Sequence, residues 1–169
     1  MYKILRTLLF LLDAEKAHGV TMKMLSTASK IAVLRLLIKK MFSFESKSLH
    51  RNVFGLEFKN AVGLAAGFDK NAEYIDALAL LGFGFIEIGT VTPKPQDGNP
   101  TPRLFRLKKD EAIINRMGFN NKGVDAVIQN LKGVKTKDII IGGNIGKNKN
   151  TPNENGIHDY TFCFERLYP

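Results

Sequence analysis

Three short apolar runs alternate with segments of helical periodicity along most of this chain. The apolar runs lie at 61–65, 85–88 and 139–141, the last running on toward Ile145, and the helical segments lie at about 71–81 and 121–131. Strands that alternate with helices in this way predict parallel βαβ units, because parallel neighbours need a long crossover connection. We favour a (β/α) barrel over a doubly wound sheet, since several different strand ends carry polar residues.

Other segments predict smaller additions to this plan. The stretch 53–60 has the pattern of a small hairpin, and two short strands are predicted on either side of a turn at 108–111. The amphipathic stretch 158–168 predicts a C-terminal helix. The polar, aperiodic stretch 43–52 is interpreted as a linker.

Each predicted strand ends in small and polar residues, in the runs AAGFDKN, EIGTVTPKPQ and GGNIGKNK. If the strands are parallel neighbours, we expect Lys70, Thr90 and Asn144 on one rim. Glycines there would leave room for a flat ligand, amide and hydroxyl groups can hydrogen-bond a heterocycle, and Lys70 can bind an anion. Singly, each run is also typical of a turn or surface loop. Jointly they predict a pocket for a planar polar cofactor and an anionic ligand.

A charged pair, Asp69 and Lys70, directly follows the small residues Ala65, Ala66 and Gly67. One interpretation is an ordinary turn with a solvated ion pair. The other is that the small residues let a ligand approach the backbone closely, with Asp69 as a structural partner of Lys70.

The first forty residues predict three helices and carry most of the positive charge. Residues 1–51 hold ten Lys and Arg against three Asp and Glu. Asp13 is a candidate N-cap for the second helix, whose apolar stripe we place on Ala17, Val20, Met24 and Ala28. The third helix, at about 30–42, is apolar on most sides and carries Lys and Arg. This composition is typical of shallow membrane contact, and also of a helical subdomain packed on the main body.

Several classes of function lack a signal in the sequence. The excess positive charge is not accompanied by a nucleic-acid-binding motif, so no nucleic-acid partner is expected. The single cysteine, Cys163, cannot form an internal disulfide and is interpreted as a packing residue. The three scattered histidines predict no metal site. No signal peptide and no run long enough to span a bilayer are found.

Long motifs in this chain resemble those of the class 2, quinone-linked dihydroorotate dehydrogenases. The motifs are GLAAGFDKN, GFGFIEIGTVTPKPQ, PRLFRL, INRMGFNNKGVD and NIGKNKNTP, with DAEKAHGVT similar to that family's N-terminal helical extension. The resemblance implies an α/β fold, a partial (β/α)8 (TIM) barrel of about three strands preceded by a helical, membrane-associating segment. It divides the chain into a membrane and quinone-tunnel segment at 1–42, a linker at 43–52 and the first part of an FMN-binding barrel at 53–169.

The resemblance also implies roles for individual residues. It implies oxidation of (S)-dihydroorotate to orotate through FMN, with ubiquinone or menaquinone as acceptor. It further implies peripheral attachment to the cytoplasmic side of a bacterial inner membrane. Residues that match FMN contacts are Ala65, Ala66, Gly67, Thr90 and Asn144. Residues that match the orotate pocket are Lys70, Asn115, Arg116, Met117, Gly118 and Phe119, with Asn115 facing the pyrimidine edge. His18 and Arg106 match positions that line the quinone tunnel.

The chain departs from the family at its C-terminal end. The family's serine base and its phosphate-binding loops are expected beyond Pro169, so no catalytic base is expected within the chain. The alternative is a non-catalytic remnant that acts as a membrane-surface or binding module.

Overall fold

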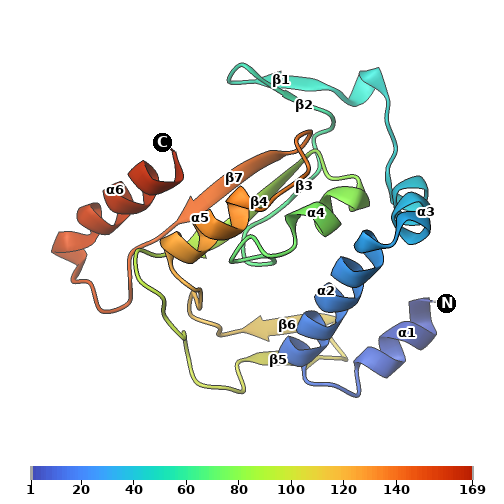
Figure 1. Cartoon of the computed structure of the whole chain (residues 1–169). Coiled ribbons are helices and arrows are strands. Elements are labelled where there is room, and N and C mark those ends of the chain that lie inside the picture. Colours follow the sequence, from blue (N-terminus) through green and yellow to red (C-terminus); the bar gives the residue numbers. More distant parts are fainter. Residues whose placement is uncertain (1, 169) are drawn as a thin grey trace.

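A computed structural model describes residues 2–168, and its N-terminal segment is helical, as the sequence predicts (Figure 1). The helices are α1 (Tyr2–Leu9), α2 (Ala14–Lys30) and α3 (Ala32–Phe42). The Asp13 side chain caps α2 by accepting hydrogen bonds from the backbone amides of Glu15 and Lys16, at 2.9 and 3.2 Å. The N-cap prediction is therefore confirmed. No described helix is both long and apolar enough to cross a bilayer.

The buried face of α2 differs from the predicted stripe. Ala17 and Met22 are buried, whereas Val20 and Met24 are exposed. Met22 belongs to the main hydrophobic core and Leu25 packs against it. The face is set by the docking of α2 against α4, and several faces of this helix carry apolar residues, so periodicity alone points to the wrong one.

A three-stranded parallel sheet forms the centre of the domain, which confirms the predicted parallel βαβ units. The strands are β3 (Gly63–Leu64), β4 (Phe85–Val91) and β7 (Ile140–Ile145), in the order β3-β4-β7. Phe85 pairs with Gly63 on one side and with Ile140 on the other. The central strand β4 is therefore hydrogen-bonded along both edges.

Helices connect and cover these strands. They are α4 (Ile75–Leu78) with the 3₁₀ turn η2 (Ala79–Leu81), α5 (Val124–Lys132), the 3₁₀ turn η3 (Asn153–Asn155) and α6 (Gly156–Leu167). Both α4 and α5 begin later than the predicted 71 and 121, because the residues before each helix bind the strand-end loops through side-chain hydrogen bonds.

The core lies between β4 and the helices. Ile86, Ile88 and Val91 of β4 are fully buried and pack with apolar residues of α4 and α5. Cys163 of α6 joins this core with no exposed surface, and burial raises the pKa of its thiol to about 11. The interpretation of Cys163 as a packing residue is thus confirmed.

Two antiparallel hairpins project from the domain, as predicted, although the first begins at Arg51, within the stretch 43–52 that was interpreted as a linker. One joins β1 (Arg51–Val53) to β2 (Leu56–Phe58) and follows the 3₁₀ turn η1 (Lys47–Leu49). The other joins β5 (Leu104–Leu107) to β6 (Ala112–Asn115). This second hairpin lies beside the start of α2 (Figure 1).

Candidate functional site at the carboxyl ends of the strands

The carboxyl ends of β3, β4 and β7 bring Thr90 and Asn144 together. The Thr90 hydroxyl donates to the side-chain oxygen of Asn144 at 2.7 Å. The loop after β3 joins them, because the Gly67 amide donates to the Gly89 carbonyl at 2.7 Å. Both polar side chains are half-buried, whereas Ala65 and Gly67 are exposed. Three separate sequence segments thus form one continuous polar rim.

Glu87 is a rim residue that sequence reasoning missed. One oxygen of its carboxylate accepts from the Asn144 side-chain amide at 3.0 Å, and the other accepts from the Ala66 backbone amide at 3.4 Å. Glu87 therefore ties the ends of all three strands together. Its signal in the sequence was an acidic residue inside an otherwise apolar strand, which is costly unless that residue is partnered.

Backbone conformation keeps this rim open at Gly67 and closely packed at Gly89. Gly67 has φ of +97°, and a Cβ atom built there would meet no atom within 4 Å. At Gly89, with φ of +100°, a Cβ would lie 2.2 Å from the Asn144 carbonyl oxygen. Glycine at 89 therefore allows β4 and β7 to approach, while glycine at 67 leaves exposed backbone that a flat group could lie against.

Lys70 points from the rim into the loop that follows β6. Its ammonium donates to the side-chain oxygen of Asn120 and lies 3.6 Å from the Met117 sulfur. Burial, followed by the positive charge of Arg103, lowers the pKa of Lys70, and Glu15 opposes this shift. The structure thus brings Lys70 to the predicted 115–119 loop, and it adds Asn120, which sequence reasoning missed. The signal for Asn120 was the second amide of the GFNN run, directly after the loop.

The 115–119 loop is fixed by its own polar contacts. The Asn115 side-chain oxygen accepts from the Met117 amide at 3.0 Å, which leaves the Asn115 NH₂ group to donate elsewhere. Asn99 donates to the Arg116 carbonyl at 2.8 Å, and Gly118 adopts φ of +74°. Phe119 is 58% exposed at the loop's end. The loop therefore presents an amide donor and an aromatic ring to solvent.

Asp69 does not pair with Lys70 in the way the sequence suggested. Its carboxylate is buried and accepts from the backbone amides of Glu73 and Tyr74, at 2.9 and 2.7 Å. Burial raises the pKa of Asp69 despite these hydrogen bonds. Asp69 therefore organises the loop before α4. The expected pairing with Lys70 is wrong, because the carboxylate turns inward to backbone donors that sequence patterns do not reveal.

His18 and Arg106 both lie where the helical segment meets the barrel, but they make different contacts there. The His18 ring meets Phe68 edge-on at 4.7 Å between centroids. Arg106 donates to the Leu12 carbonyl at 2.7 Å, and its guanidinium carbon lies 4.4 Å from the centre of the Phe10 ring. Nearby, Arg103 forms a hydrogen-bonded ion pair with Glu15 at 2.6 Å. These contacts dock the start of α2 onto the rim side of the domain.

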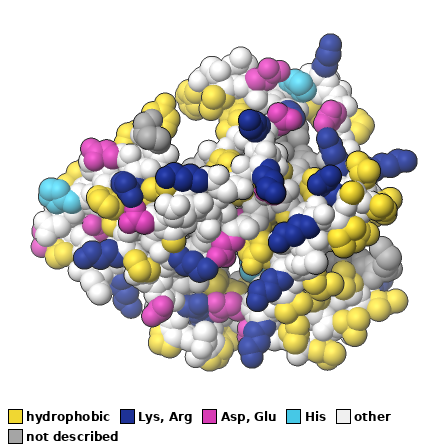
Figure 2. Space-filling view, viewed as in Figure 1, with side chains coloured by type: hydrophobic (Ala, Val, Ile, Leu, Met, Phe, Trp, Pro, Cys, Tyr) yellow, Lys and Arg dark blue, Asp and Glu magenta, His cyan; other side chains and the backbone are white. Residues whose placement is uncertain are grey.

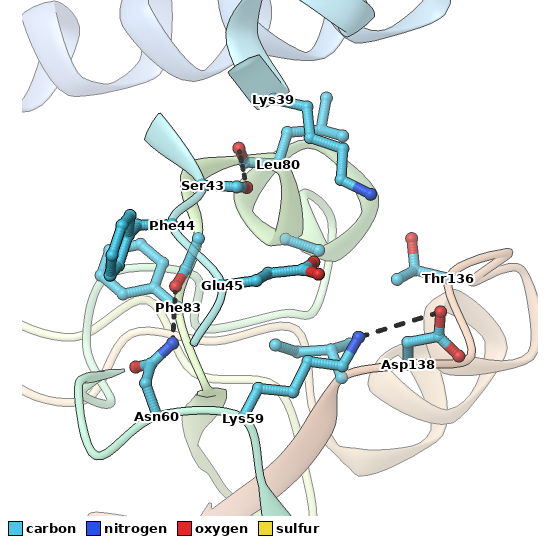
Figure 3. A pocket seen from close by; sticks show the side chains of 13 residues that line it. Lys39, Ser43, Phe44, Glu45, Lys59, Asn60, Leu80, Phe83, Thr136 and Asp138 are labelled. Atoms are coloured by element: carbon cyan, nitrogen blue, oxygen red, sulfur yellow. Dashed lines mark hydrogen bonds and ion pairs between the residues drawn. The ribbon is translucent and has the colours of Figure 1, made fainter. Parts of the chain in front are cut away.

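A small cavity of about 130 Å³ lies elsewhere, between α3 and the segments that precede β3 and β7 (Figure 3). Lys39, Ser43 and Glu45 line one side, and Lys59 faces Asp138 across it at 3.9 Å. None of the rim residues lines this cavity, so it is separate from the candidate site. Among the described residues, no cluster of His, Cys, Asp or Glu is placed to hold a metal ion.

Parallel strands whose carboxyl ends carry a cluster of polar side chains are typical of ligand-binding α/β domains, in barrels and in doubly wound sheets alike. A family model for dihydroorotate dehydrogenase matches residues 48–169. The chain belongs to the dihydroorotate dehydrogenase family.

Relatives and solved structures agree with this assignment. Proteins named dihydroorotate dehydrogenase (quinone) from Christiangramia forsetii and Stenotrophomonas maltophilia are 56% and 53% identical over 99% and 100% of this chain. The dihydroorotate dehydrogenase from Eimeria tenella in complex with ferulenol superposes with a TM-score of 0.73 at 40% identity, over 95% of this chain and 43% of that one. The chain spans about half the length of the curated relatives it matches, 49% and 47% in these two cases.

Proposed function

We propose that this chain provides the N-terminal half of a quinone-dependent dihydroorotate dehydrogenase, which oxidises (S)-dihydroorotate to orotate in de novo pyrimidine (UMP) biosynthesis. The observation that carries the proposal is the position of Lys70, held against Met117 and Asn120 beside the rim. Identity of 53–56% to quinone-dependent enzymes over nearly the whole chain supports it.

The rim fits the ring of FMN. Ala65 and Gly67 are exposed and Ala66 between them is half-buried, so this segment offers a surface without bulky side chains, and no atom lies within 4 Å of a Cβ built on Gly67. Thr90 and Asn144 would hold the polar edge of the ring, and Glu87 fixes Asn144 in place. Bound FMN would supply the two-electron acceptor chemistry that links dihydroorotate to the quinone.

Residues of this chain would bind and orient the substrate. Lys70 would pair with the carboxylate of dihydroorotate through a charge-assisted hydrogen bond. The Asn115 NH₂ group would donate to the pyrimidine edge, since its oxygen is already engaged. Arg116, Gly118 and Phe119 would complete the wall of the orotate pocket. The proton would leave to a serine base on polypeptide beyond Pro169.

The quinone would approach between the helical segment and the barrel, near His18 and Arg106. Exposed apolar residues cover α1 and α3, including Leu5, Leu8, Leu36 and Met41, with Lys and Arg among them. Figure 2 shows hydrophobic side chains gathered with dark-blue cations where these helices lie in Figure 1. Such a surface would attach the protein peripherally to the cytoplasmic side of a bacterial inner membrane and admit ubiquinone or menaquinone.

The test is activity of this chain joined to the C-terminal half of the Christiangramia forsetii relative. We expect dihydroorotate oxidation with a ubiquinone analogue as acceptor, and little with NAD⁺. A folded, flavin-loaded hybrid that reduces neither acceptor would contradict the proposal.

A second candidate rests on the same exposed apolar helices. The chain would then act as a non-catalytic membrane-surface module. It predicts vesicle binding by the chain together with an inactive hybrid, whereas the first proposal predicts an active one.

A further inference from the structure

A second hollow lies on the outer side of the domain, away from the rim. It measures about 650 Å³ and opens between the C-terminal end of α2, the start of α3, α4 and the C-terminal end of α5. Figure 1 shows α4 between α5 on one side and α2 and α3 on the other. The hollow is not lined by Lys70, Thr90 or Asn144, so it is separate from the proposed catalytic site. Its volume lies in the range of small-molecule sites, about 300–1,000 Å³.

Three cations from three separate elements line this hollow. They are Lys30 at the end of α2, Arg35 on α3 and Lys135 after α5. No salt bridge or side-chain hydrogen bond of these three cations occurs within residues 2–168. All three side chains are exposed to the solvent that fills the hollow, so their charges are accessible to an anion that enters it.

The acidic residues of the hollow are already engaged. Glu73 pairs with Lys122, which lies outside the hollow. Asp76 accepts from the Lys135 and Thr136 backbone amides and from the Thr136 hydroxyl, at 2.8–3.3 Å. Asp76 keeps its negative charge, because its donors are neutral, so among the described residues the hollow is lined by three unpaired cations against one carboxylate without a cationic partner.

Neutral donors complete the lining. Tyr74 and Ser26 both line the hollow, and no hydrogen bond from the hydroxyl of either one is found in the described part of the chain. Burial raises the pKa of Tyr74, so its hydroxyl stays protonated and can donate. Guanidinium, ammonium and hydroxyl donors together match an anion with several acceptor oxygens, such as a phosphoryl group.

We propose that the hollow between α2, α3, α4 and α5 binds a phosphoryl group through Lys30, Arg35 and Lys135, with Tyr74 and Ser26 as hydroxyl donors. The phosphoryl group comes from an anionic phospholipid headgroup or from a free phosphate or phosphomonoester. Its position beside the apolar helices would couple occupancy of the hollow to the docking of α2 and α3 on the barrel.

The first arm of the test titrates the full chain with inorganic phosphate at constant ionic strength. We expect saturable binding that weakens at least about tenfold in Arg35→Gln/Lys135→Gln, since two charge-assisted contacts are lost. The matched control is Lys40→Gln/Lys132→Gln, which removes the same charge from two residues that are exposed like Arg35 and Lys135 but lie outside the hollow. Tyr74→Phe keeps all charges and should weaken binding a few-fold.

The second arm uses vesicles of phosphatidylglycerol in phosphatidylcholine. A greater loss of vesicle binding in Arg35→Gln/Lys135→Gln than in the control assigns the site to a lipid headgroup. Equal vesicle binding by the two variants, with selective loss of phosphate binding, assigns it to a free phosphate or phosphomonoester. If neither probe distinguishes the two double variants, the proposal is overturned.

Discussion

Lys70 donates a hydrogen bond to the side-chain oxygen of Asn120, fifty residues further along the chain. This contact joins the loop after β3 to the loop after β6. Because burial lowers the pKa of Lys70, the ammonium is held in a partly desolvated place where an anionic substrate would strengthen its charged form. This hydrogen bond positions the ammonium of Lys70, which is the cation that we expect to bind the substrate carboxylate.

Replacing Lys70 with alanine should therefore impair dihydroorotate oxidation in the hybrid with the C-terminal half of a relative. Loss of a charge-assisted hydrogen bond costs about 1.5–3 kcal/mol, or about 10- to 150-fold in kcat/KM. Lys132→Ala, an exposed change on α5, serves as the control. Steady-state kinetics measure this loss, and an unchanged kcat/KM in Lys70→Ala would show that the residue does not take part in the site.

Asp69 should be more important for stability than for chemistry. Asp69→Ala leaves the Glu73 and Tyr74 amides without their acceptor and should lower the free energy of unfolding by about 1–3 kcal/mol. Asp69→Asn keeps an acceptor oxygen and should recover part of this loss. Urea unfolding of the full chain measures both, and equal stability of the alanine variant and the wild type would contradict the assigned role.

Docking of α2 should weaken in acid through Glu15. The Arg103 hydrogen bond lowers the pKa of Glu15 from its ordinary value of 4.5. A lowered carboxyl pKa contributes stability that is present above pH 4.5 and is lost as the pH falls through the lower folded value. We expect this contribution to be about 1 kcal/mol, because the pair is partly exposed.

Urea unfolding at several pH values tests this dependence on Glu15. Stability of the wild type should fall more steeply below about pH 4.5 than that of Glu15→Gln, which cannot titrate at this position. Parallel pH profiles for the two proteins would show that Glu15 does not carry the effect.

Membrane attachment should depend on the apolar surface of α1 and α3. Leu8 and Leu36 are 58% and 67% exposed, and Leu8→Ser/Leu36→Ser should reduce sedimentation with anionic liposomes several-fold. Val62→Ser alters an equally exposed apolar residue, 66% exposed and outside these helices, and should not change sedimentation. Equal loss in both variants, or no binding by the wild type at low salt, would favour the packed-subdomain interpretation.

The rim was predictable because parallel strands place their carboxyl ends at one edge. That rule brought Thr90 and Asn144 together from sequence, and the structure joins them by a hydrogen bond. The acidic Glu87 inside an apolar strand indicated a partnered residue, but its partners Ala66 and Asn144 were not predictable, since strand register decides which neighbours its side chain meets. Asp69 was misassigned because adjacency in sequence suggests an ion pair, whereas the fold turns the carboxylate toward buried amides.

Which face of a helix packs against the core was also not predictable from the sequence. Met22 rather than Met24 enters the core, because the docking of α2 on α4 selects one of several apolar faces. The hollow lined by Lys30, Arg35 and Lys135 had no sequence signal at all, since its residues come from three elements that only the tertiary fold brings together.

The central claim is that this chain supplies the ring- and substrate-binding side of the enzyme and requires a second half for catalysis. General-base assistance is worth about 10²–10⁴ in rate, and the serine base is expected beyond Pro169. The direct measurement compares quinone-analogue reduction with dihydroorotate by the 169-residue chain alone and by the same chain joined to the C-terminal half of a relative. We predict a flavin-poor chain without turnover on its own and steady turnover in the joined protein. Steady turnover by a yellow preparation of the 169-residue chain alone would contradict this account.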